Sequence, residues 1–377
     1  MIPTLSELTC QRMLSLTQAA LHGTIPDEGL FADTGETDWS KLFEQCVAQG
    51  VMILSLEGAM RLPKSLQPPL VVKLRWIASV EAVKKRYQHQ LEAAESLTVY
   101  FRGNNVRMLL LKGFTLSRLY PVASSREFGD IDIFLCGKAK EGDVLLKRIN
   151  KKHVTSTKHT SFSYRGIPIE NHHTLLHQGI YKKFRHSKAL EKQLVMMLEK
   201  AGLMEELDLS TYRGTDEILL FPPAEFDVLY VTLHMLTHLP EGIVLRHLCD
   251  LTVLFTAYQG KIDFSSYREI LSNAGLLNIV NVLISLAVQY LGLNPEYAPP
   301  YECDLSLEQR IWNDLLHPVP LPSKEKPHIY HVFLYKIRLL RTQYWKYQLV
   351  FPGQFVKGIL YSIFFHVRYP HSIGKIK

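Results

Sequence analysis

The chain has 377 residues, of which 47% are hydrophobic and 21% are charged. These proportions are ordinary for a globular protein, and the length leaves room for two or three domains with a sizeable core. The formal net charge of +7 is spread along the chain without a block of five or six like charges. Such a charge suits a small polyanionic ligand, but it gives no clear nucleic-acid signature.

The cysteines and the apolar segments indicate the compartment. The cysteines lie far apart and form no C-x-x-C pair; they are Cys10, Cys46, Cys136, Cys249 and Cys303. A disulfide framework or a thiolate zinc site is therefore not expected, which favours a cytoplasmic location. The first residues lack the basic-then-apolar order of a signal peptide, and no apolar stretch reaches 18 residues. We therefore expect a soluble chain without a transmembrane segment.

Residues 1–102 are predicted to form a helical N-terminal region. Apolar residues recur at three- and four-residue spacings near 4–22 and 39–60. A longer helix is expected from Pro69 to about Phe101, and Gly103-Asn104-Asn105 ends it. The apolar stripe of this helix is interpreted as core packing.

Residues 103–215 are predicted to form a mixed α/β core. Its expected elements are a buried strand at 106–111, a helix at 114–120, a strand at 130–135, a helix at 138–151 and a hairpin at 162–170. The hairpin turn is placed at Arg165-Gly166. The polar stretch 171–186 is expected to be a loop with part of a helix.

From residue 216 the pattern is helical almost to the end. The predicted bundle, 216–347, has helices near 224–239, 243–258, 264–273, 276–291, 305–316 and 325–347. The last segment, 348–377, is interpreted as a docked helix with a basic tail, in preference to a membrane-surface or partner-binding segment. The fold class is therefore α+β, with a small mixed sheet between an N-terminal helical region and a C-terminal helical bundle.

Two acids alternate with apolar residues in the sequence Asp130-Ile131-Asp132-Ile133. In a strand, Asp130 and Asp132 share one face, where they repel each other unless a cation lies between them. A D-x-D pair alone is often a solvated strand face. The Lys112-Gly113 turn before the pair and Glu170 at the end of a later strand strengthen the interpretation as a metal site.

A carboxylate cluster of this kind suits phosphoryl and nucleotidyl transfer. Carboxylates hold Mg²⁺, and two ions can orient an attacking hydroxyl and neutralise charge at phosphorus. The turn after the first strand offers backbone N–H groups at Gly113 to a triphosphate. Lys112, Arg118 and Arg126 could add cationic contacts, with Arg126 the best candidate.

The string LLLKGFTLSRLYP…SREFGDIDIFL, followed by IPIENHH, resembles the bacterial uncharacterised nucleotidyltransferase family of the DNA polymerase β-like superfamily. The matching positions are Leu111, Lys112, Gly113, Leu116, Tyr120, Pro121, Arg126, Asp130, Ile131, Asp132 and Glu170, with His172 two residues on. Residues 234–254 are similar to the C-terminal part of the family, with His234, His238 and Asp250 in similar places. The likeness spans about 106–255.

The resemblance implies that Asp130, Asp132 and Glu170 are catalytic and bind Mg²⁺, and that Gly113 meets the phosphates. The expected reaction moves a nucleoside monophosphate from an NTP to an acceptor hydroxyl and releases pyrophosphate. Two departures stand out: Lys-Gly replaces the usual Gly-Ser or Gly-Gly, and the third acid is Glu instead of Asp. They leave an alternative open, a catalytically inactive nucleotide-binding or regulatory protein. No motif indicates the acceptor, the choice of NTP or the oligomeric state.

Several histidines invite other interpretations. His234 and His238 share one helix face, but HMLTH lacks the glutamate of H-E-x-x-H, so hydrogen bonding at a domain interface is preferred to a metal pair. Arg246 and Asp250 are interpreted as a surface or interdomain pair. A third group of histidines could indicate a metal-dependent phosphohydrolase, but we prefer to interpret them as part of a polar loop near phosphate. They are His153, His159, His172, His173 and His177. Among these, His172 lies beside Glu170.

Overall fold

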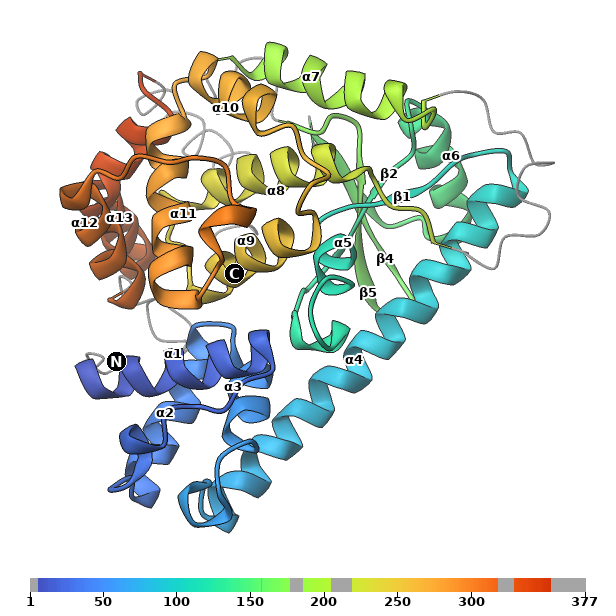
Figure 1. Cartoon of the computed structure of the whole chain (residues 1–377). Coiled ribbons are helices and arrows are strands. Elements are labelled where there is room, and N and C mark those ends of the chain that lie inside the picture. Colours follow the sequence, from blue (N-terminus) through green and yellow to red (C-terminus); the bar gives the residue numbers. More distant parts are fainter. Residues whose placement is uncertain (1–5, 157, 177–185, 205–218, 318–328, 354–377) are drawn as a thin grey trace.

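A computed structural model describes residues 6–156, 158–176, 186–204, 219–317 and 329–353. It shows a mixed sheet beside a C-terminal helical bundle, with the N-terminal helices packed below the bundle (Figure 1). The predicted α+β class is therefore confirmed. The predicted boundaries of the four regions (1–102, 103–215, 216–347 and 348–377) stay predictions, and residues 354–377 of the last region lie outside the described residues.

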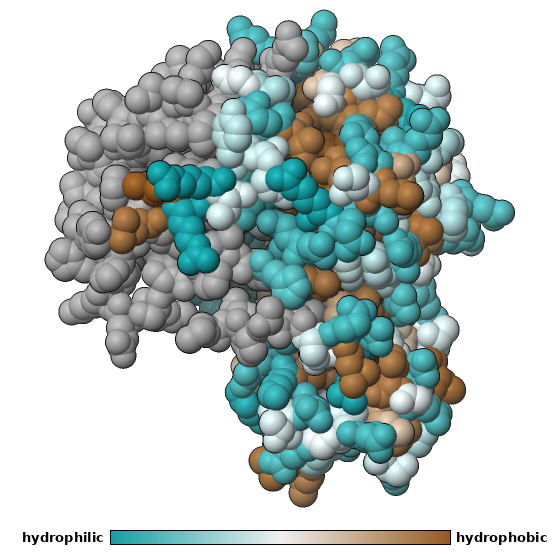
Figure 2. Space-filling view, turned by 90° about the vertical axis from the view of Figure 1, so that its left-hand side faces the viewer, coloured by the Kyte–Doolittle hydropathy of each residue, from teal (hydrophilic) through white to brown (hydrophobic). Residues whose placement is uncertain are grey.

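The N-terminal helices are α1 (Glu7–His22), α2 (Glu36–Ala48) and α3 (Met52–Ala59), with short 3-10 helices η1 (Glu28–Phe31) and η2 (Lys64–Leu66). Ser6 caps α1 by accepting a hydrogen bond from the Thr9 N–H, and Gly23 ends it with φ +72°. The single helical segment expected at 39–60 is two helices, because the chain turns at Gly50 with φ +67°. These helices form the lobe at the lower end of the molecule in Figures 1 and 2, and on the face in Figure 2 the lobe mixes hydrophilic and hydrophobic side chains.

Helix α4 (Leu70–Gly103) joins this lobe to the sheet (Figure 1). Its 34 residues span about 50 Å at about 1.5 Å per residue. The first half contributes Val72, Trp76, Val80 and Val83 to the core that extends through the N-terminal helices and the bundle. The second half contributes Ala93, Ala94, Leu97 and Phe101 to a separate core under the sheet. The predicted long helix and its role in core packing are confirmed.

The strands are β1 (Leu109–Leu110), β2 (Ile131–Phe134), β3 (His153–Thr155), β4 (His159–Tyr164) and β5 (Ile167–His172). They form one sheet in the order β1-β2-β5-β4-β3. The β2–β5 pair is parallel, and the other pairs are antiparallel. The predicted hairpin is confirmed, since Arg165 and Gly166 form its turn with φ +51° and +79°.

The two faces of the sheet have opposite character. Ile131, Ile133 and Ile169 are buried on the face that packs against the second half of α4 and against α6 (Ala139–Ile149). Because side chains alternate along a strand, Asp132 and Glu170 lie on the other face. Helix α5 (Gly113–Ser117) and the 3-10 helix η3 (Ala123–Ser125) connect β1 to β2.

The bundle contains α7 (Ser187–Lys200), α8 (Ala224–His238), α9 (Leu245–Ala257), α10 (Phe264–Asn273), α11 (Leu277–Leu291), η6 (Pro295–Tyr297), α12 (Leu305–Leu316) and α13 (Ile329–Val350). The helices predicted between residues 224 and 347 are found, with ends shifted by a few residues. Helix α7 was not predicted as a separate element. Within the described ranges, no helix has the length and apolar character needed to cross a membrane.

Candidate functional site

Lys112 and Asp132 form a buried ion pair at the centre of the polar face. Lys112 follows β1, and its Nζ lies 2.5 Å from Oδ1 of Asp132 in β2. The two side chains are only 9% and 5% exposed. The backbone of Lys112 has φ +47° and ψ −97°, which is costly for a residue with a Cβ. The turn therefore stores strain at the point where it delivers the ammonium group to the carboxylate.

The two charges hold each other in the ionised state. Burial disfavours the charged form of Asp132, but the Lys112 ammonium and the contact with His172 hold the pKa of Asp132 well below its usual range. Burial likewise disfavours the charged form of Lys112, but Asp132 raises its pKa above the ordinary value. The centre of the site is thus a fixed negative charge paired with a fixed positive charge at neutral pH.

Glu170 lies opposite Asp132 on the neighbouring strand. The parallel register of β2 and β5 pairs Asp132 with Glu170 and Phe134 with His172. His172 is fully buried, and its Nε2 lies 2.7 Å from Oδ1 of Asp132 and 3.5 Å from Nζ of Lys112. Burial and the Lys112 charge lower the pKa of His172 to about 3, so its ring is neutral at physiological pH.

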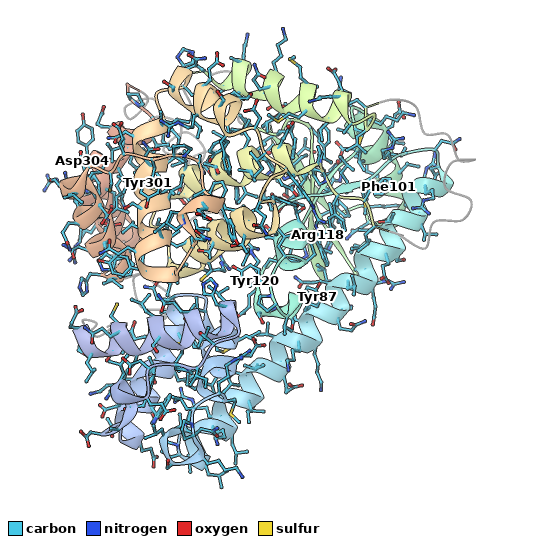
Figure 3. All side chains as sticks on the ribbon, in the orientation of Figure 1. Tyr87, Phe101, Arg118, Tyr120, Tyr301 and Asp304 are labelled. Carbon is cyan, nitrogen blue, oxygen red and sulfur yellow. The ribbon has the colours of Figure 1, made fainter. Side chains whose placement is uncertain are left out.

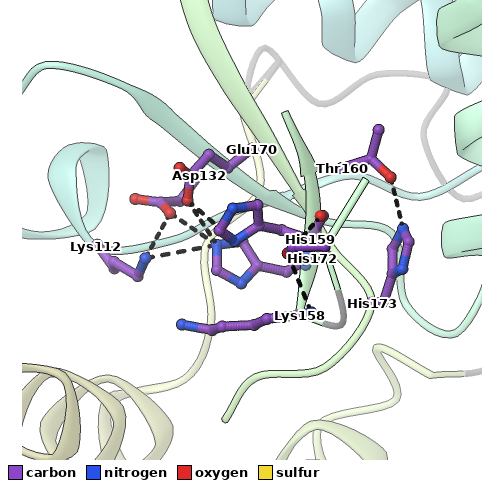
Figure 4. A network of polar contacts seen from close by, with 9 residues as sticks. Lys112, Asp132, Lys158, His159, Thr160, Glu170, His172 and His173 are labelled. Atoms are coloured by element: carbon purple, nitrogen blue, oxygen red, sulfur yellow. Dashed lines mark hydrogen bonds and ion pairs between the residues drawn. The ribbon is translucent and has the colours of Figure 1, made fainter. Parts of the chain in front are cut away.

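A second histidine enters from the hairpin partner. His159 of β4 pairs with His172 of β5, and their ring centroids are 5.6 Å apart. Nδ1 of His159 lies 3.4 Å from Oε2 of Glu170. Figure 4 shows Lys112, Asp132, Glu170 and the two imidazoles converging on one side of the hairpin. His173 turns to the opposite side, where its Nε2 lies 2.9 Å from Asp143 and 3.0 Å from Thr160.

Arg126 is held by the bundle. Its guanidinium donates two hydrogen bonds to the carboxylate of Asp250 in α9, over 3.1 and 3.0 Å. The Tyr120 hydroxyl donates to the same carboxylate over 2.8 Å. All three side chains are buried. Asp132 contributes, after Asp250, to the raised pKa of Arg126, so this cluster lies within electrostatic reach of the site.

Arg118, which follows α5, also points toward the bundle (Figure 3). It donates a 2.6 Å hydrogen bond to the Tyr258 hydroxyl and lies 3.4 Å from Asp227 of α8. Its guanidinium stacks over the Phe221 ring at 4.5 Å. Burial raises the pKa of Asp227 to about 7, against the opposing effects of Tyr258 and Arg118.

The remaining predicted site residues are Gly113 and Asp130. A Cβ on Gly113 would lie 2.7 Å from the Phe128 ring, so the glycine permits close packing of α5 against the loop before β2. Asp130 is half-buried and immediately precedes β2, one residue outside the strand expected to hold it. The structure thus brings together Lys112, Asp132 and Glu170, while the arginines contact acids of the bundle.

Two residues of α8 lie within electrostatic reach of the site, although they were not predicted to do so. The Tyr230 hydroxyl is buried and makes no hydrogen bond within the described part of the chain. Lys112 and Asp132 both act on its pKa, which burial raises above the ordinary value. His234 lies one turn on, and burial followed by the Lys112 charge lowers its pKa. The signal available in the sequence was the four-residue spacing of Tyr230, His234 and His238.

The position of His159 could have been predicted from the hairpin. A two-residue turn at Arg165-Gly166 pairs every residue with the one equally distant across the turn, which places His159 opposite His172. His234 and His238, which were predicted to share one helix face, contact each other through their rings, with centroids 4.6 Å apart. The predicted pair of Arg246 and Asp250 is wrong: Asp250 forms its ion pair with Arg126, and Arg246 donates to the Glu127 carbonyl. His177 lies outside the described residues.

The fold and the site define an α+β protein with a carboxylate site on one face of a mixed sheet. The family described as "Uncharacterised nucleotidyltransferase" matches residues 35–292, from the start of α2 to the end of α11. This match covers more than half of the chain, and the chain belongs to that family. Comparisons with curated proteins and with solved structures gave no match.

Proposed function

We propose that this protein is a Mg²⁺-dependent nucleotidyltransferase that moves a nucleoside monophosphate from an NTP to an acceptor hydroxyl. The observation that carries this proposal is the register pair of Asp132 and Glu170 on parallel strands, with Lys112 delivered beside it by the β1–α5 turn. Membership of a nucleotidyltransferase family supports the same chemistry.

The donor set fits Mg²⁺. Asp130, Asp132 and Glu170 would hold the ion, because hard cations prefer carboxylate oxygens. Asp132 and Glu170 are register partners on the parallel strands β2 and β5, and Asp130 immediately precedes β2. When bound, Mg²⁺ supplies charge neutralisation at the phosphates and makes the acceptor hydroxyl more acidic.

In the transfer itself, the acceptor oxygen forms a bond to the α-phosphorus, and the bond from that phosphorus to the bridging oxygen breaks. Pyrophosphate leaves with the electron pair, and the acceptor proton passes to a base. Glu170, half-buried beside the ionised Asp132, is our candidate for orienting the hydroxyl and accepting this proton. Lys112 would offset phosphate charge from its buried position.

The arginines take different parts in this proposal. Arg118 keeps a side chain 36% exposed and could still meet a phosphate from its position beside Asp227. Arg126 has its guanidinium bound to Asp250 over 3.0 and 3.1 Å, so its contribution would be to hold α9 against the core within electrostatic reach of Asp132. Gly113 would meet the phosphates through its backbone N–H at the start of α5, because the space beside its Cα is filled by the Phe128 ring.

The test is release of pyrophosphate and labelling of an acceptor when the purified protein receives Mg²⁺ and each α-labelled NTP with a broad acceptor panel. We expect Asp132→Asn and Glu170→Gln to lower turnover by about 100-fold or more. Asp143→Asn is the matched control, because Asp143 is 15% exposed, comparable to Glu170 at 17%, but its contacts lie on the far side of the hairpin. Turnover in Asp132→Asn equal to that of the unaltered protein would contradict the proposal.

One observation favours the alternative of a non-catalytic nucleotide binder. The Lys112 ammonium already neutralises Asp132, the carboxylate that a metal would need. For such a protein we expect NTP binding that is independent of Mg²⁺, with no pyrophosphate from any of the four NTPs. Binding that requires Mg²⁺, accompanied by turnover, would eliminate this alternative.

A further inference from the structure

The β4–β5 hairpin brings two histidines and a glutamate to one point. His159 and His172 are cross-strand partners, and Glu170 lies two residues before His172, on the same face. One donor atom from each of the three lies within 4.8 Å of the other two. No other set of three His, Cys, Asp or Glu side chains in the described ranges comes this close.

The distances suit ligands around a common ion. Nδ1 of His159 is 3.4 Å, and Nε2 of His172 is 3.9 Å, from the same Oε2 of Glu170. Both separations exceed those of an ordinary N–H···O hydrogen bond, which are about 2.7–3.2 Å. Nitrogen and oxygen ligands held about 2.1 Å from a tetrahedral ion are about 3.4 Å apart. The His159 separation matches this value, and the His172 separation is 0.5 Å longer (3.9 against 3.4 Å). One donor atom of each residue lies within 4.8 Å of the other two, so the side chains would close slightly around a bound ion.

The exposure of the three side chains gives such an ion a route into the site. His172 is fully buried and forms the floor, while Glu170 and His159 are 17% and 23% exposed at the rim. An ion could therefore enter over the rim and keep at least one coordination position open.

We infer that His159, Glu170 and His172 bind a divalent first-row transition-metal ion of the Zn²⁺ and Co²⁺ kind. Two imidazoles and one carboxylate favour such ions over Mg²⁺, which prefers oxygen ligands. Three protein ligands with an open position are typical of catalytic zinc sites. The inference rests on the proposed function in sharing Glu170. It adds a second cation site next to Asp132. The ion would take the place of the proton that Nε2 of His172 shares with Oδ1 of Asp132 over 2.7 Å.

Titration of the metal-free full-length protein with Co²⁺, followed by visible ligand-field absorption, tests this site. We expect saturation at one ion per chain. His159→Ala should weaken binding by about tenfold or more, because it removes one of three ligands. The matched control is His173→Ala, since His173 is 22% exposed and belongs to the opposite side of the hairpin. No saturable absorption, or equal affinity in His159→Ala and the unaltered protein, would overturn the inference.

A second variant guards against misfolding of the first. In His159→Cys a thiolate would take the place of the imidazole, and bound Co²⁺ should then show a near-ultraviolet sulfur-to-metal charge-transfer band absent from the unaltered protein. Co²⁺ binding without that band would exclude residue 159 from the coordination shell.

The inference and the proposed function can fail separately. Asp130→Asn should retain Co²⁺ affinity within about twofold, because Asp130 is not among the three donors. It should abolish nucleotidyl transfer if the proposed function is right. Transfer with Mg²⁺ in a protein that binds no Co²⁺ would refute the transition-metal site alone. Tight Co²⁺ binding without transfer would support the site and refute the proposed function.

Discussion

Lys112 combines a strained backbone with a buried charge, and both features serve the contact with Asp132. A lysine this far from solvent must have a partner, since removing one member of a buried pair leaves the other charge uncompensated. Here the partner is also the carboxylate that the proposed chemistry uses. Without a ligand, the charges of Lys112 and Asp132 cancel. A cation that binds Asp132 must therefore compete with the Lys112 ammonium group.

Replacing Lys112 should expose this dependence. We expect Lys112→Met to lower the free energy of unfolding by about 3–5 kcal/mol at neutral pH, because Asp132 loses its counter-charge. Without Lys112, burial should raise the pKa of Asp132, so the deficit should shrink as the pH falls and the carboxylate takes up a proton. Urea unfolding at several pH values measures both effects.

The control for that experiment is Lys84→Met. Lys84 pairs with Glu81 on the surface of α4, where the side chains are 45% and 56% exposed. Such exposed pairs contribute about 1 kcal/mol or less, so this variant should unfold almost like the unaltered protein. A Lys112→Met protein that is equally stable would show that the buried pair contributes nothing.

At the level of residues, the sequence indicates position where one strand or turn determines it. Asp132, Glu170 and Lys112 meet because alternation along strands and the turn after β1 place them on one face. The hydrogen-bond partner of Arg126 could not be predicted from the sequence, because Asp250 is 124 residues away along the chain. The interpretation of Arg126 as a phosphate contact stays a prediction.

At the scale of elements, α5 packs against the loop before β2 through a glycine. The ring of Phe128 lies over Gly113 and meets Phe114 edge-on, with centroids 4.8 Å apart. Helical periodicity predicted most helices, but it could not reveal this contact. Nor did it reveal the break in the segment at 39–60, because both halves continue the same apolar spacing.

A methyl group at residue 113 should displace this ring. We expect Gly113→Ala to destabilise the protein by about 1–3 kcal/mol, because its Cβ would lie 2.7–2.8 Å from Phe128 ring atoms. Adding Phe128→Leu should recover part of the loss, which is the non-additive behaviour of contacting residues. Chemical denaturation of the two variants provides the measurement.

Gly129→Ala offers the comparison, since a Cβ there would meet nothing within 4 Å. We expect its unfolding free energy to stay within about 0.5 kcal/mol of the unaltered protein. If Gly113→Ala behaves in the same way, α5 has room to move away from the loop and the close approach is not required.

At the scale of the whole molecule, two ion pairs fasten the α/β core to the bundle. Arg126 reaches Asp250 of α9, and Arg118 reaches Asp227 of α8. Both arginines come from the segment between β1 and β2, which also carries the site turn. A shift of the bundle relative to the sheet would therefore also move the segment that carries Lys112, which contacts Asp132.

Asp227 makes this connection sensitive to pH. Its folded pKa of about 7 exceeds the unfolded value of about 3.9, so the folded protein binds the proton more tightly. The resulting stability is fully present below about pH 4 and is lost as the pH rises through about 7. At about 1.4 kcal/mol per pKa unit, the total is about 4 kcal/mol.

We expect Asp227→Asn to flatten the dependence of the unfolding free energy on pH between about 4 and 7. Asp33→Asn, at an exposed position of the N-terminal lobe, should leave the curve unchanged. A curve for Asp227→Asn that runs parallel to that of the unaltered protein would show that another group is responsible.

Helix α4 has a consequence for how much of the chain the site needs. A fragment beginning after residue 103 would retain every carboxylate, histidine and lysine of the proposed site. It would nevertheless lose Ala93, Ala94, Leu97 and Phe101, which cover the apolar face of the sheet from behind. The same helix anchors its other end in the N-terminal lobe through Trp76, which donates a hydrogen bond to the Met52 carbonyl. The smallest fragment that folds on its own and keeps the site should therefore include the lobe, although none of the lobe residues that the structure describes enters the site.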